Sequence, residues 1–555
     1  MGQLSFHFHP VGEFLGMLSF TPETAWTRCA IAFASLACLC YIWIHTSRQR
    51  KSHSNNIPYA IPSLRGTIPF IFNGLEFLQR SRQNFPKWAT FRISIIRDDI
   101  FIIQGPKNAG QLFHDARLSV TTAYSLVLGQ CFGMKRQALD VYNADTSGSR
   151  QKPILGSNLE PQDRISFMTH ESLRSGLLKE GLGPAFHRFR EYLSQSLLNA
   201  EIGDEWVECP DMSKFFEKHL GTSLVRTLFG EELLAQHPGF VEDLWEYDKG
   251  VMNLIRGLPR FLTLRTHRIR DRLVRSVERW HEKASDPVSC PKESNGFSDQ
   301  SLWGSDMMKE RYHMLLATKG QDAKSVAITD LALIWASVTN VAPSTMTLAL
   351  HVLSSSSLLS SLRTSLSSTG PLPSIESLES IPLLLSMYAE TLRFGVQVHI
   401  PRIAPHHELT IGGATIPRNK LMMANTWLMH MDDTLWNTKG GEKPLDEFWA
   451  ERFLVDPEDP TSGPGKTAGP RDGEKGVHFS TADVEGAWIP YGGGHHACPG
   501  RLLSKRIMLF STAMLINMFD IEIISRDSIK FDSPKFGLGV RKPRGRVRFR
   551  MRRRR

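Results

Sequence analysis

One segment constrains this chain more than any other, because it joins a glycine run, a cysteine and the start of a helix. It reads Trp-Ile-Pro-Tyr-Gly-Gly-Gly-His-His-Ala-Cys-Pro-Gly over residues 488–500. Three consecutive glycines let the backbone adopt positive φ and approach a flat ligand closely. Cys498 stands just before a helix-like run over 501–519, where helix amides stabilise a thiolate. The alternative is a buried cysteine beside a glycine turn, which a lone cysteine or a lone glycine run would favour.

The spacing aromatic-x-x-Gly-x-His-x-Cys-x-Gly in this segment resembles the haem-binding loop of the cytochrome P450 haem-thiolate monooxygenases. Tyr491, Gly494, His496, Cys498 and Gly500 occupy the family's positions, with tyrosine in place of the usual phenylalanine. The resemblance implies that Cys498 is the axial thiolate ligand of the haem iron and that His496 contacts a haem propionate. Electron donation from such a thiolate favours O–O bond cleavage.

A second mark of the family lies upstream. Glu390-Thr-Leu-Arg393 ends an amphipathic pattern, and the i, i+3 spacing places carboxylate and guanidinium on one helix face. The segment 448–453, Phe-Trp-Ala-Glu-Arg-Phe, resembles the family's meander and adds Arg452. The resemblance implies a buried structural network of these three side chains, since an unpaired charge in the core is costly. The pair Glu171 and Arg174 has the same spacing and is assigned no function.

The segment 334–344 resembles the family's oxygen-binding groove, with Thr339-Asn340 where an acid–alcohol pair normally stands. Pro343 has no amide hydrogen, so the Thr339 carbonyl loses its helical partner and the helix is expected to kink there. We expect a water or oxygen site at the bend. Proton delivery would then rely on water held by this carbonyl or on a substrate hydroxyl. The alternative is a kink that serves packing alone.

The sequence assigns residues to only some of the expected contacts with the haem propionates. Arg402 follows Pro401 where the family often has a propionate-binding arginine, although the usual Pro-Pro after the Glu-x-x-Arg pair is missing. The family's Trp-x-x-x-Arg helix is also missing between residues 140 and 200. Trp88 and Arg92 have that spacing but fall in a predicted β-hairpin. One propionate contact therefore has no residue assigned to it.

Hydrophobic periodicity predicts a mainly α-helical body with small β-sheets, and the resemblance, which covers roughly residues 57–550, implies the cytochrome P450 fold. We expect helices around 184–199, 212–229, 264–283, 327–352, 376–394 and 500–518, and a β-hairpin over 89–104. Turn-rich stretches at 145–162, 285–306 and 456–486 are expected to be surface loops. The pattern around Asn340 and Pro343 is similar to the sterol-7-hydroxylase and prostacyclin-synthase branch of the family.

The amino-terminal region predicts a membrane anchor. No residue from Cys29 to Ser47 is charged, and Arg48, Arg50 and Lys51 follow. This run just spans a bilayer, and the basic flank places its carboxyl side in the cytosol. A cleaved signal peptide is the alternative, but its charge order would be reversed. We therefore predict a luminal segment 1–28, a transmembrane anchor 29–47, a basic, proline-rich hinge 48–70 and a cytosolic catalytic domain 71–555 on the endoplasmic reticulum.

The formal net charge of +10 comes from the end of the chain, because the last fifteen residues hold ten basic side chains and no acidic one. A single basic terminus is unlike a stripe that follows a nucleic-acid backbone, so we expect no nucleic-acid partner. Val547, Phe549 and Met551 alternate with arginines, which predicts a final β-strand with one apolar face. The seven cysteines are scattered and indicate neither a disulfide framework nor a zinc ribbon.

The resemblance implies a haem-thiolate monooxygenase that inserts an oxygen atom from O2 into a lipophilic small molecule, such as a terpenoid, sterol-like or polyketide natural product. It would use haem b and electrons from NADPH through a membrane reductase. A redox-independent isomerase or dehydratase is one alternative, and NADPH dependence separates the two. A non-catalytic haem binder is another, which turnover would exclude. The expected walls of the substrate pocket lie near 121–134, 245–261, 396–400 and 533–540.

Overall fold

The computed structural model describes residues 63–95, 98–286, 302–367, 369–370, 372–467, 475–525 and 529–555. The predicted anchor 29–47 and most of the predicted hinge lie outside these residues. Helix α2 (Ser63–Phe72) begins inside the segment that the sequence assigns to the hinge. Phe70 in this helix packs against a hydrophobic cluster of the body, with its ring centroid 6.0 Å from that of Phe77.

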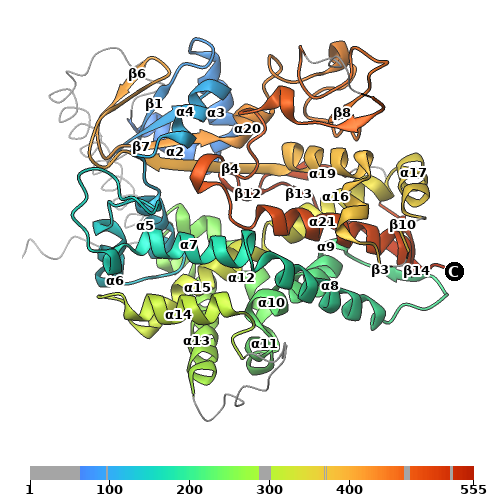
Figure 1. The fold of residues 1–555 in the computed structure, drawn as a ribbon, viewed down its shortest axis with the longest axis horizontal. Helices are drawn as coiled ribbons and strands as arrows, with labels where there is room; N and C mark the ends of the chain where they lie inside the picture. The colour runs from blue at the N-terminus through green and yellow to red at the C-terminus, as the bar shows by residue number, and fades with distance from the viewer. Residues whose placement is uncertain are drawn as a thin grey trace, which may run out of the picture.

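Helices form most of the molecule, and many of the strands lie toward the upper left of the view and at its right edge (Figure 1). The first group is α3 (Gly74–Gln83), α4 (Pro106–His114), α5 (Thr121–Gln130), α6 (Arg136–Ala144), α7 (Ile165–Leu178), α8 (Leu182–Leu198), α9 (Met212–Phe216), α10 (Thr222–Phe229), α11 (Glu232–Gln236), α12 (Phe240–Ile255) and α13 (Leu264–Ser285). The second is α14 (Asp306–Ala317), α15 (Ala323–Val338), α16 (Val341–Leu353), α17 (Ser356–Leu366), α18 (Ile375–Glu379), α19 (Pro382–Gly395), α20 (Thr426–His430) and α21 (Arg501–Met518).

The predicted helices are present, and two of them are divided at prolines. The helix expected over 376–394 is two helices, because Pro382 starts α19 and cannot continue α18. The helix expected over 327–352 is interrupted at Thr339-Asn340, between α15 and α16. This break lies where Pro343 removes an amide donor, so the predicted kink is confirmed.

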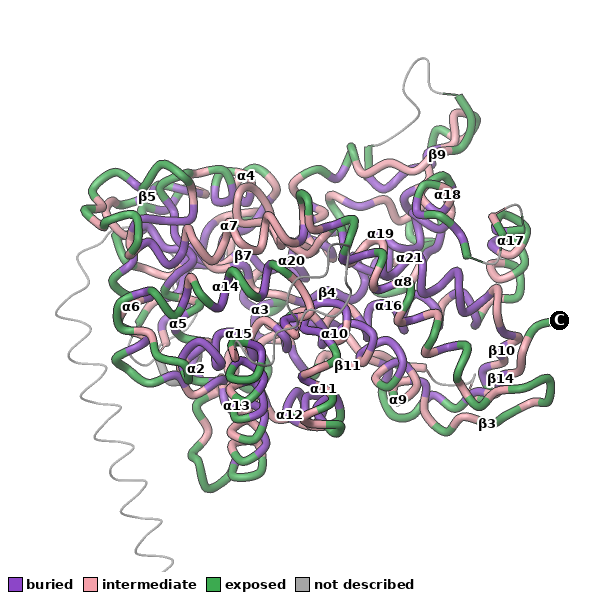
Figure 2. Tube along the Cα trace, turned by 60° about the horizontal axis from the view of Figure 1, so that its bottom comes forward, coloured by how far each residue is buried: buried purple, intermediate pink, exposed green. Residues whose placement is uncertain are grey.

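The α15–α16 run is the centre of the core. Among the described residues, only Ala323–Leu353 is long and apolar enough, by length and composition, to cross a membrane. Its most apolar window is 67% buried inside the protein, which identifies a core helix. In Figure 2 the tube is largely buried along α16 and α21, whereas β3 and the outer end of α13 are mostly exposed. The helix that carries the predicted oxygen groove is therefore enclosed by the rest of the domain.

Five strands form the main sheet, in the order β1-β2-β7-β4-β12, and three form a second sheet, in the order β10-β14-β3. The strands are β1 (Phe91–Ile95), β2 (Asp98–Ile103), β3 (Val207–Cys209), β4 (Val396–Ile403), β5 (Leu409–Ile411), β6 (Ala414–Ile416), β7 (Leu421–Asn425), β8 (Leu454–Val455), β9 (His478–Phe479), β10 (Phe519–Ile523), β11 (Phe531–Asp532), β12 (Leu538–Val540), β13 (Lys542–Pro543) and β14 (Phe549–Arg553). β1 and β2 form the predicted hairpin. β12 pairs with β4 in the register Val540 to Val396, which joins two of the expected pocket walls.

The predicted final strand is β14. Its apolar residues and Val547 are at most 2% exposed, whereas its arginines lie on the other face. The ion pairs of this arginine face are Arg548 with Glu208, Arg550 with Glu522 and Arg552 with Asp520. The basic terminus is thus one side of an ordinary sheet, where acidic neighbours partly neutralise it.

The prediction of a surface loop over 145–162 is wrong for its first part. Asp145, Ser147 and Ser149 are 2%, 0% and 3% exposed. The Asp145 carboxylate accepts hydrogen bonds from the amides of Ser147 at 2.9 Å and Ser166 at 2.7 Å. Polar side chains enter the interior here because each finds a hydrogen-bond partner. The segment lies against the cysteine loop, as described next.

Candidate active site

The cysteine loop runs from Trp488 to Gly500 and leads into α21. The Cys498 amide donates a hydrogen bond to the Tyr491 carbonyl at 2.9 Å, which closes the loop. Gly494 has φ +63°, and a Cβ on it would overlap the Phe113 carbonyl oxygen of α4. A Cβ on Gly493 would overlap the Phe113 ring. The glycine run is therefore required by the close approach of α4 as well as by positive φ.

The Cys498 thiol lies deep in the protein. Burial raises its pKa, while the Gly500 amide and the Arg501 charge lower it by less. As an isolated thiol Cys498 would remain protonated, whereas a bound metal cation deprotonates a coordinating thiol. A single soft sulfur donor at the start of a helix fits the axial position of a haem iron.

Tyr491, which replaces the family's usual phenylalanine, has a polar partner. Its hydroxyl lies 3.1 Å from the Tyr388 hydroxyl of α19, and burial raises the pKa of both groups. The sequence indicated only that the two ring shapes match. A hydroxyl is tolerated here because the Tyr388 hydroxyl is its hydrogen-bond partner, whereas a buried hydroxyl without a partner would be destabilising.

The loop and its surroundings border an internal space. Every residue from Tyr491 to Gly500 is partly accessible, although burial raises the pKa of Cys498. Tyr124 on α5 is 53% exposed, yet burial raises the pKa of its hydroxyl and the charges of Arg402 and Cys498 act on it. Because Tyr124 lies below the protein surface, its accessible area faces a space inside the protein.

Arg402 on β4 faces the same space and is 2% exposed. Its Nη1 donates to the Pro401 carbonyl at 2.8 Å and its Nη2 to the Gly493 carbonyl at 3.4 Å, but its Nε has no partner. Burial lowers the pKa of Arg402 to about 10. Within the described part of the chain, no carboxylate forms an ion pair with it. A buried guanidinium in this state fits an anionic ligand such as a haem propionate.

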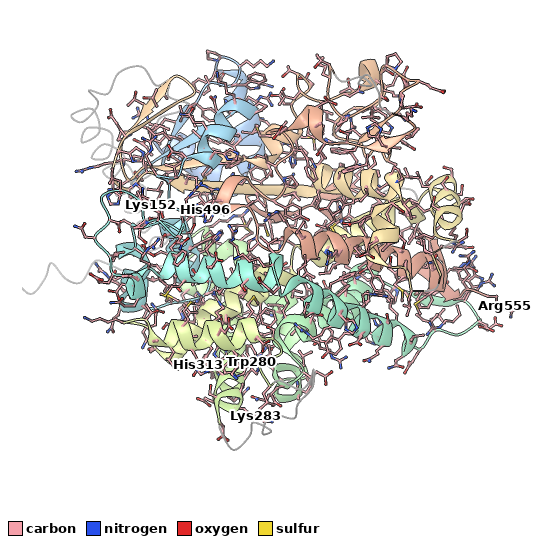
Figure 3. The ribbon with its side chains drawn as sticks, in the orientation of Figure 1. Lys152, Trp280, Lys283, His313, His496 and Arg555 are labelled. Carbon is pink, nitrogen blue, oxygen red and sulfur yellow. The ribbon has the colours of Figure 1, made fainter. Side chains whose placement is uncertain are left out.

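His496 lies beside the buried segment 145–149. Its Nδ1 is 3.1 Å from the Ser149 hydroxyl, and burial lowers its pKa to about 2. Figure 3 labels His496 and Lys152 in the same region, with Arg555 at the opposite edge of the view. The neutral imidazole can donate one hydrogen bond to an anion but adds no charge.

Two further residues, to which the sequence analysis gave no role, lie beside the cysteine loop. His170 and Arg174 are four residues apart on α7, so they share one helix face. The His170 ring centroid lies 4.6 Å from that of His495, and Arg174 Nη1 is 3.3 Å from His495 Nδ1. Arg174 also forms a long ion pair with Glu171 at 3.7 Å. Histidine stands where the expected pattern has tryptophan, so a search for His-x-x-x-Arg would have found the pair.

The Glu390 network forms as predicted and is completely buried. Arg393 Nε donates to Glu390 Oε2 at 2.7 Å, and Arg452 Nε donates to Oε1 at 3.1 Å, with all three side chains 0% exposed. Arg393 also holds His430, because its carbonyl accepts from His430 Nδ1 at 3.1 Å. His430 Nε2 in turn accepts from the Ile489 amide at 3.1 Å. The network therefore supports the first residues of the cysteine loop rather than reacting itself.

On the opposite side of the core, Thr339 and Asn340 form the break between α15 and α16. The Thr339 carbonyl, which Pro343 leaves without a helical partner, accepts a hydrogen bond from Lys535 Nζ at 3.3 Å. The carbonyl that we expected to be free to hold water therefore already has the Lys535 ammonium group as a partner. Asn340 Oδ1 is buried and has no hydrogen-bond partner. The sequence offered no reason to connect Lys535 with this helix.

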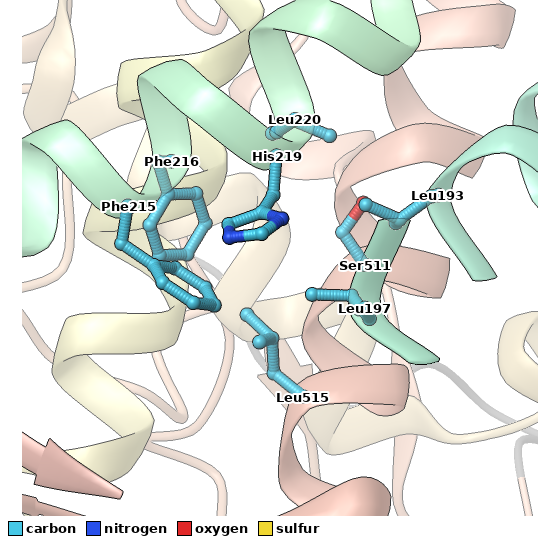
Figure 4. A pocket seen from close by; sticks show the side chains of 8 residues that line it. All are labelled: Leu193, Leu197, Phe215, Phe216, His219, Leu220, Ser511 and Leu515. Atoms are coloured by element: carbon cyan, nitrogen blue, oxygen red, sulfur yellow. The ribbon is translucent and has the colours of Figure 1, made fainter. Parts of the chain in front are cut away.

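Figure 4 shows a different cavity, of about 10 Å³, which holds at most one water molecule. Its lining residues are Leu193, Leu197, Phe215, Phe216, His219, Leu220, Ser511 and Leu515. Ser511 lies about 15 Å along α21 from the start of that helix. This cavity is a packing defect between α8, α9 and α21 and is separate from the cysteine loop.

Comparisons with known proteins agree with this geometry. The cytochrome P450 family model matches residues 305–549. The cytochrome P450 monooxygenase efuG of Hormonema carpetanum is 28% identical over 519 residues, which cover 90% of this chain and 89% of that protein. Cholesterol 7-alpha-monooxygenase of Cricetulus griseus is 22% identical over 550 residues, which cover 93% and 97%. The solved structure of retinoic acid-bound cyanobacterial CYP120A1 matches with a TM-score of 0.61 at 16% identity, over 90% of this chain and all of that one.

These matches confirm the predicted fold, the predicted enzyme class and the likeness to a sterol 7-hydroxylase. The protein is a monooxygenase that acts on a small molecule, with haem, O2 and electrons delivered from NADPH through a reductase. Buried cations and a lone thiol around one internal space are what such a haem requires of the chain. Residues 305–549 are a cytochrome P450 domain, and the described chain has the cytochrome P450 fold.

Proposed function

We propose that this monooxygenase binds its haem through Cys498 and oxidises a lipophilic small molecule held beside the α15–α16 break. One observation carries the proposal: the loop that holds Cys498 lies against Arg402, a buried guanidinium whose Nη2 donates to the Gly493 carbonyl at 3.4 Å and whose Nε has no hydrogen-bond partner. Bound haem would supply the iron centre that activates O2. Cys498 would hold the iron, while Arg402 would neutralise a propionate.

The chain's own residues have distinct roles in this arrangement. Arg174 would bind the second propionate, the contact that the sequence left unassigned, and His170 would fix the position of His495 through the ring contact. His496 would donate one hydrogen bond to a propionate, oriented by Ser149. Together these groups would hold the flat cofactor beside the cysteine loop, with Asn340, which is partly accessible, nearer to it than the fully buried Thr339.

A lipophilic substrate is supported by the pocket walls. α5 contacts α12, α15 and β4, and β12 pairs with β4, so the four segments expected to line the pocket meet around α15. We infer a terpenoid, sterol-like or polyketide substrate, and the named sterol substrate of one relative is in keeping with this class. Incubation with a reductase, NADPH and candidate lipids, followed by mass analysis, should detect products that carry one added oxygen. Conversion without NADPH would instead favour the isomerase alternative.

The ligand assignment is tested by spectroscopy. In the reduced protein treated with carbon monoxide, the wild type should show the red-shifted Soret band of thiolate ligation, and Cys498→Ala should lose it. Cys131→Ala is the matched control, because Cys131 is also a free cysteine whose pKa is raised by burial, to about 12, and it lies outside the loop. Retention of the band in Cys498→Ala, or its loss in the control alone, would refute the assignment.

We further propose that residues 29–47 anchor the protein in the endoplasmic reticulum with the catalytic domain in the cytosol. The uncharged run and the basic residues that follow it support this topology. In intact microsomes, protease added outside should degrade the catalytic domain. Full protection of the domain would contradict the proposed orientation.

A further inference from the structure

A chain of charged groups runs from the protein surface to the break between α15 and α16. The carboxylate of Asp248 on α12 accepts hydrogen bonds from Trp335 Nε1 at 2.8 Å and from Lys535 Nζ at 2.8 Å, both at Oδ1. Its Oδ2 accepts from Lys542 Nζ at 3.1 Å. The side chains of Asp248 and Lys535 are 2% and 3% exposed, whereas that of Lys542 is 27% exposed. Only the Lys542 end of this chain reaches solvent.

The inner end meets the helix break. Lys535 Nζ lies 3.3 Å from both the carbonyl oxygen and the hydroxyl oxygen of Thr339. Gly539 makes this approach possible, since a Cβ there would lie 2.8 Å from Lys535 Cε and 3.1 Å from Asn340 Oδ1. The ammonium group and the unpartnered Asn340 carboxamide are therefore close neighbours.

The charges in this cluster do not balance, because two ammonium groups share one carboxylate. Excess charge in the interior is costly and favours release of a proton. Burial, with a smaller contribution from Lys542, lowers the pKa of Lys535 to about 8, and Asp248 opposes this change. The charged groups that face Lys535 are Asp248 from α12 and Lys542 from β13, while α15 contributes the uncharged Thr339 and Trp335. Lys535 can therefore release and regain a proton near neutral pH.

We propose that Lys542, Asp248 and Lys535 carry protons from solvent to the Thr339 hydroxyl at the α15–α16 break, beside the haem site. The proposal rests on the proposed function, because Thr339 is fully buried and its proton must reach the reacting oxygen through the partly accessible position of Asn340. Monooxygenation of a substrate RH consumes one O2, two electrons and two protons, and yields ROH and water. The electrons come from NADPH through the reductase, and the protons must come from solvent. Thr339-Asn340 has no carboxylic acid, and a neutral carboxamide is a poor proton donor.

Each proton transfer along this route conserves both hydrogen atoms and charge. Lys535 Nζ gives a proton to Thr339 Oγ1, which passes its own proton into the site, and Lys535 becomes a neutral amine. Lys542 then protonates Asp248 at Oδ2. Rotation of the carboxyl group about its Cβ–Cγ bond presents this proton to Lys535 Nζ. Lys542 regains a proton from water, so one proton enters at the surface for each proton delivered at Thr339.

The test compares Lys535→Arg with Lys535→Met in the full-length holoenzyme. Arginine preserves the charge beside Asp248 but does not deprotonate in proteins, whereas methionine preserves only the bulk of the side chain. If Lys535 delivers protons, both variants should form roughly tenfold less product per NADPH and release hydrogen peroxide instead. The wild type should lose coupling as the pH rises past about 8, and neither variant should show this step. If the ion pair is only structural, Lys535→Arg should couple like the wild type, which would overturn the proposal.

A second readout does not depend on activity. The pKa of Lys535 is about 8 in the folded protein, below its ordinary value of 10.5. Between these values the unfolded chain holds a proton that the folded protein has released, so this group makes stability rise with pH. The thermal midpoint of Lys535→Arg, relative to the wild type, should therefore fall as the pH is raised through this range. An unchanged difference would overturn the assignment of Lys535 as an exchangeable site.

The matched control is Arg311→Met, which breaks another buried ion pair on α15, between Arg311 and Asp330 at 2.7 Å. Asp330 lies about 13 Å along the helix from Thr339, so this variant should lose stability without loss of coupling. Uncoupling in the control equal to that in Lys535→Met would overturn the proposal. The carbon monoxide spectrum of the wild type tests the ligand assignment, which absence of a thiolate band would refute. Normal thiolate bands together with normal coupling in both Lys535 variants would refute only the proton route.

Discussion

Two buried clusters in this enzyme have the same composition by charge, one carboxylate and two cations, yet they differ in what they can do. The guanidinium cluster is Glu390, Arg393 and Arg452, and all of it is 0% exposed. The ammonium cluster is Asp248, Lys535 and Lys542, and it reaches solvent at Lys542. The first joins α19 to the meander below the cysteine loop. The second joins α12 and the carboxy-terminal strands to the α15–α16 break.

The difference between the cations explains the difference in role. A guanidinium stays protonated and has five donors, and Arg393 uses them on Glu390 and on the carbonyls of His430 and Leu445. Such a cluster is a permanent structural joint. An ammonium group is a point charge whose pKa falls readily on burial, and Lys535 is an example. A cluster built on lysine can therefore exchange protons where one built on arginine cannot.

The largest effect should come from Glu390→Gln, which leaves two buried guanidinium groups without a counter-charge. We expect a loss of about 3–5 kcal/mol in the free energy of unfolding and a low yield of haem-loaded protein. The matched control is Glu246→Gln, because Glu246 also pairs with two cations, Lys249 and Arg265, but at the exposed surface. The control should lose no more than about 1 kcal/mol in thermal unfolding. Equal losses in the two variants would mean that burial does not set the strength of the guanidinium cluster.

Asp248→Asn should produce the next largest loss, about 3 kcal/mol at neutral pH, since it removes the carboxylate from the ammonium cluster. Without Asp248, Lys535 should become neutral at a lower pH, because Asp248 is the group that raises its pKa. The destabilisation should therefore shrink as the pH rises toward about 8 and stay constant above that, whereas that of Glu390→Gln should not change, because arginine remains charged. Chemical unfolding across this range measures both. Parallel pH dependence in the two variants would contradict the distinction between the clusters.

Gly539→Ala should have a smaller effect, roughly 1 kcal/mol, because its methyl group would press against Lys535 Cε. Displacement of Lys535 from Thr339 should also lower the yield of product per NADPH. Gly395→Ala is the control, since a Cβ at Gly395 meets nothing within 4 Å. A crystal structure of the Gly539→Ala variant should show Lys535 displaced from Thr339. If the structure showed this contact intact and coupling were unchanged, Gly539 would not be needed to hold Lys535 against Thr339.

Lys542→Gln should have the smallest effect on stability, within about 1 kcal/mol, because this lysine is partly exposed. Its removal should lower coupling, because Lys542 passes the proton to Asp248, and should move the remaining pH step to higher pH, because its charge lowers the pKa of Lys535. Lys439→Gln is the control, because Lys439 is similarly exposed and pairs with Asp459 away from the cluster. A step that moves to lower pH in Lys542→Gln would show that the two lysines do not interact as described.

The proximal half of the site was predictable because its signals are short-range. Gly494, His496 and Cys498 lie within five consecutive residues, and Glu390 and Arg393 are separated by a single helical turn, so local spacing predicts their geometry. The alternation of Val547, Phe549 and Met551 likewise predicted β14. Proline chemistry predicted the break at Thr339, since the missing amide of Pro343 acts within one turn.

Other contacts could not be predicted because their partners are far apart in the chain. Ser149 and His496 are 347 residues apart, and the serine lies in a polar stretch that local composition assigned to a surface loop. Arg174 was noted only as a partner of Glu171, and its pairing with His170 was missed because histidine replaces the expected tryptophan. In each case the residue type is compatible with solvent, and only its hydrogen-bond partners in the folded protein place it inside.

The sequence by itself determined the family, the cysteine loop, the guanidinium cluster and the position of the helix break, because each depends on residues held together by chain continuity or helix periodicity. Only the tertiary structure decided what meets the freed Thr339 carbonyl. Lys535 and Asp248 are 287 residues apart, and each alone resembles an ordinary surface charge. Packing of β12 against β4, and of α12 against the core, excludes water from around them. That exclusion makes the charge of Lys535 costly enough for its proton to become exchangeable.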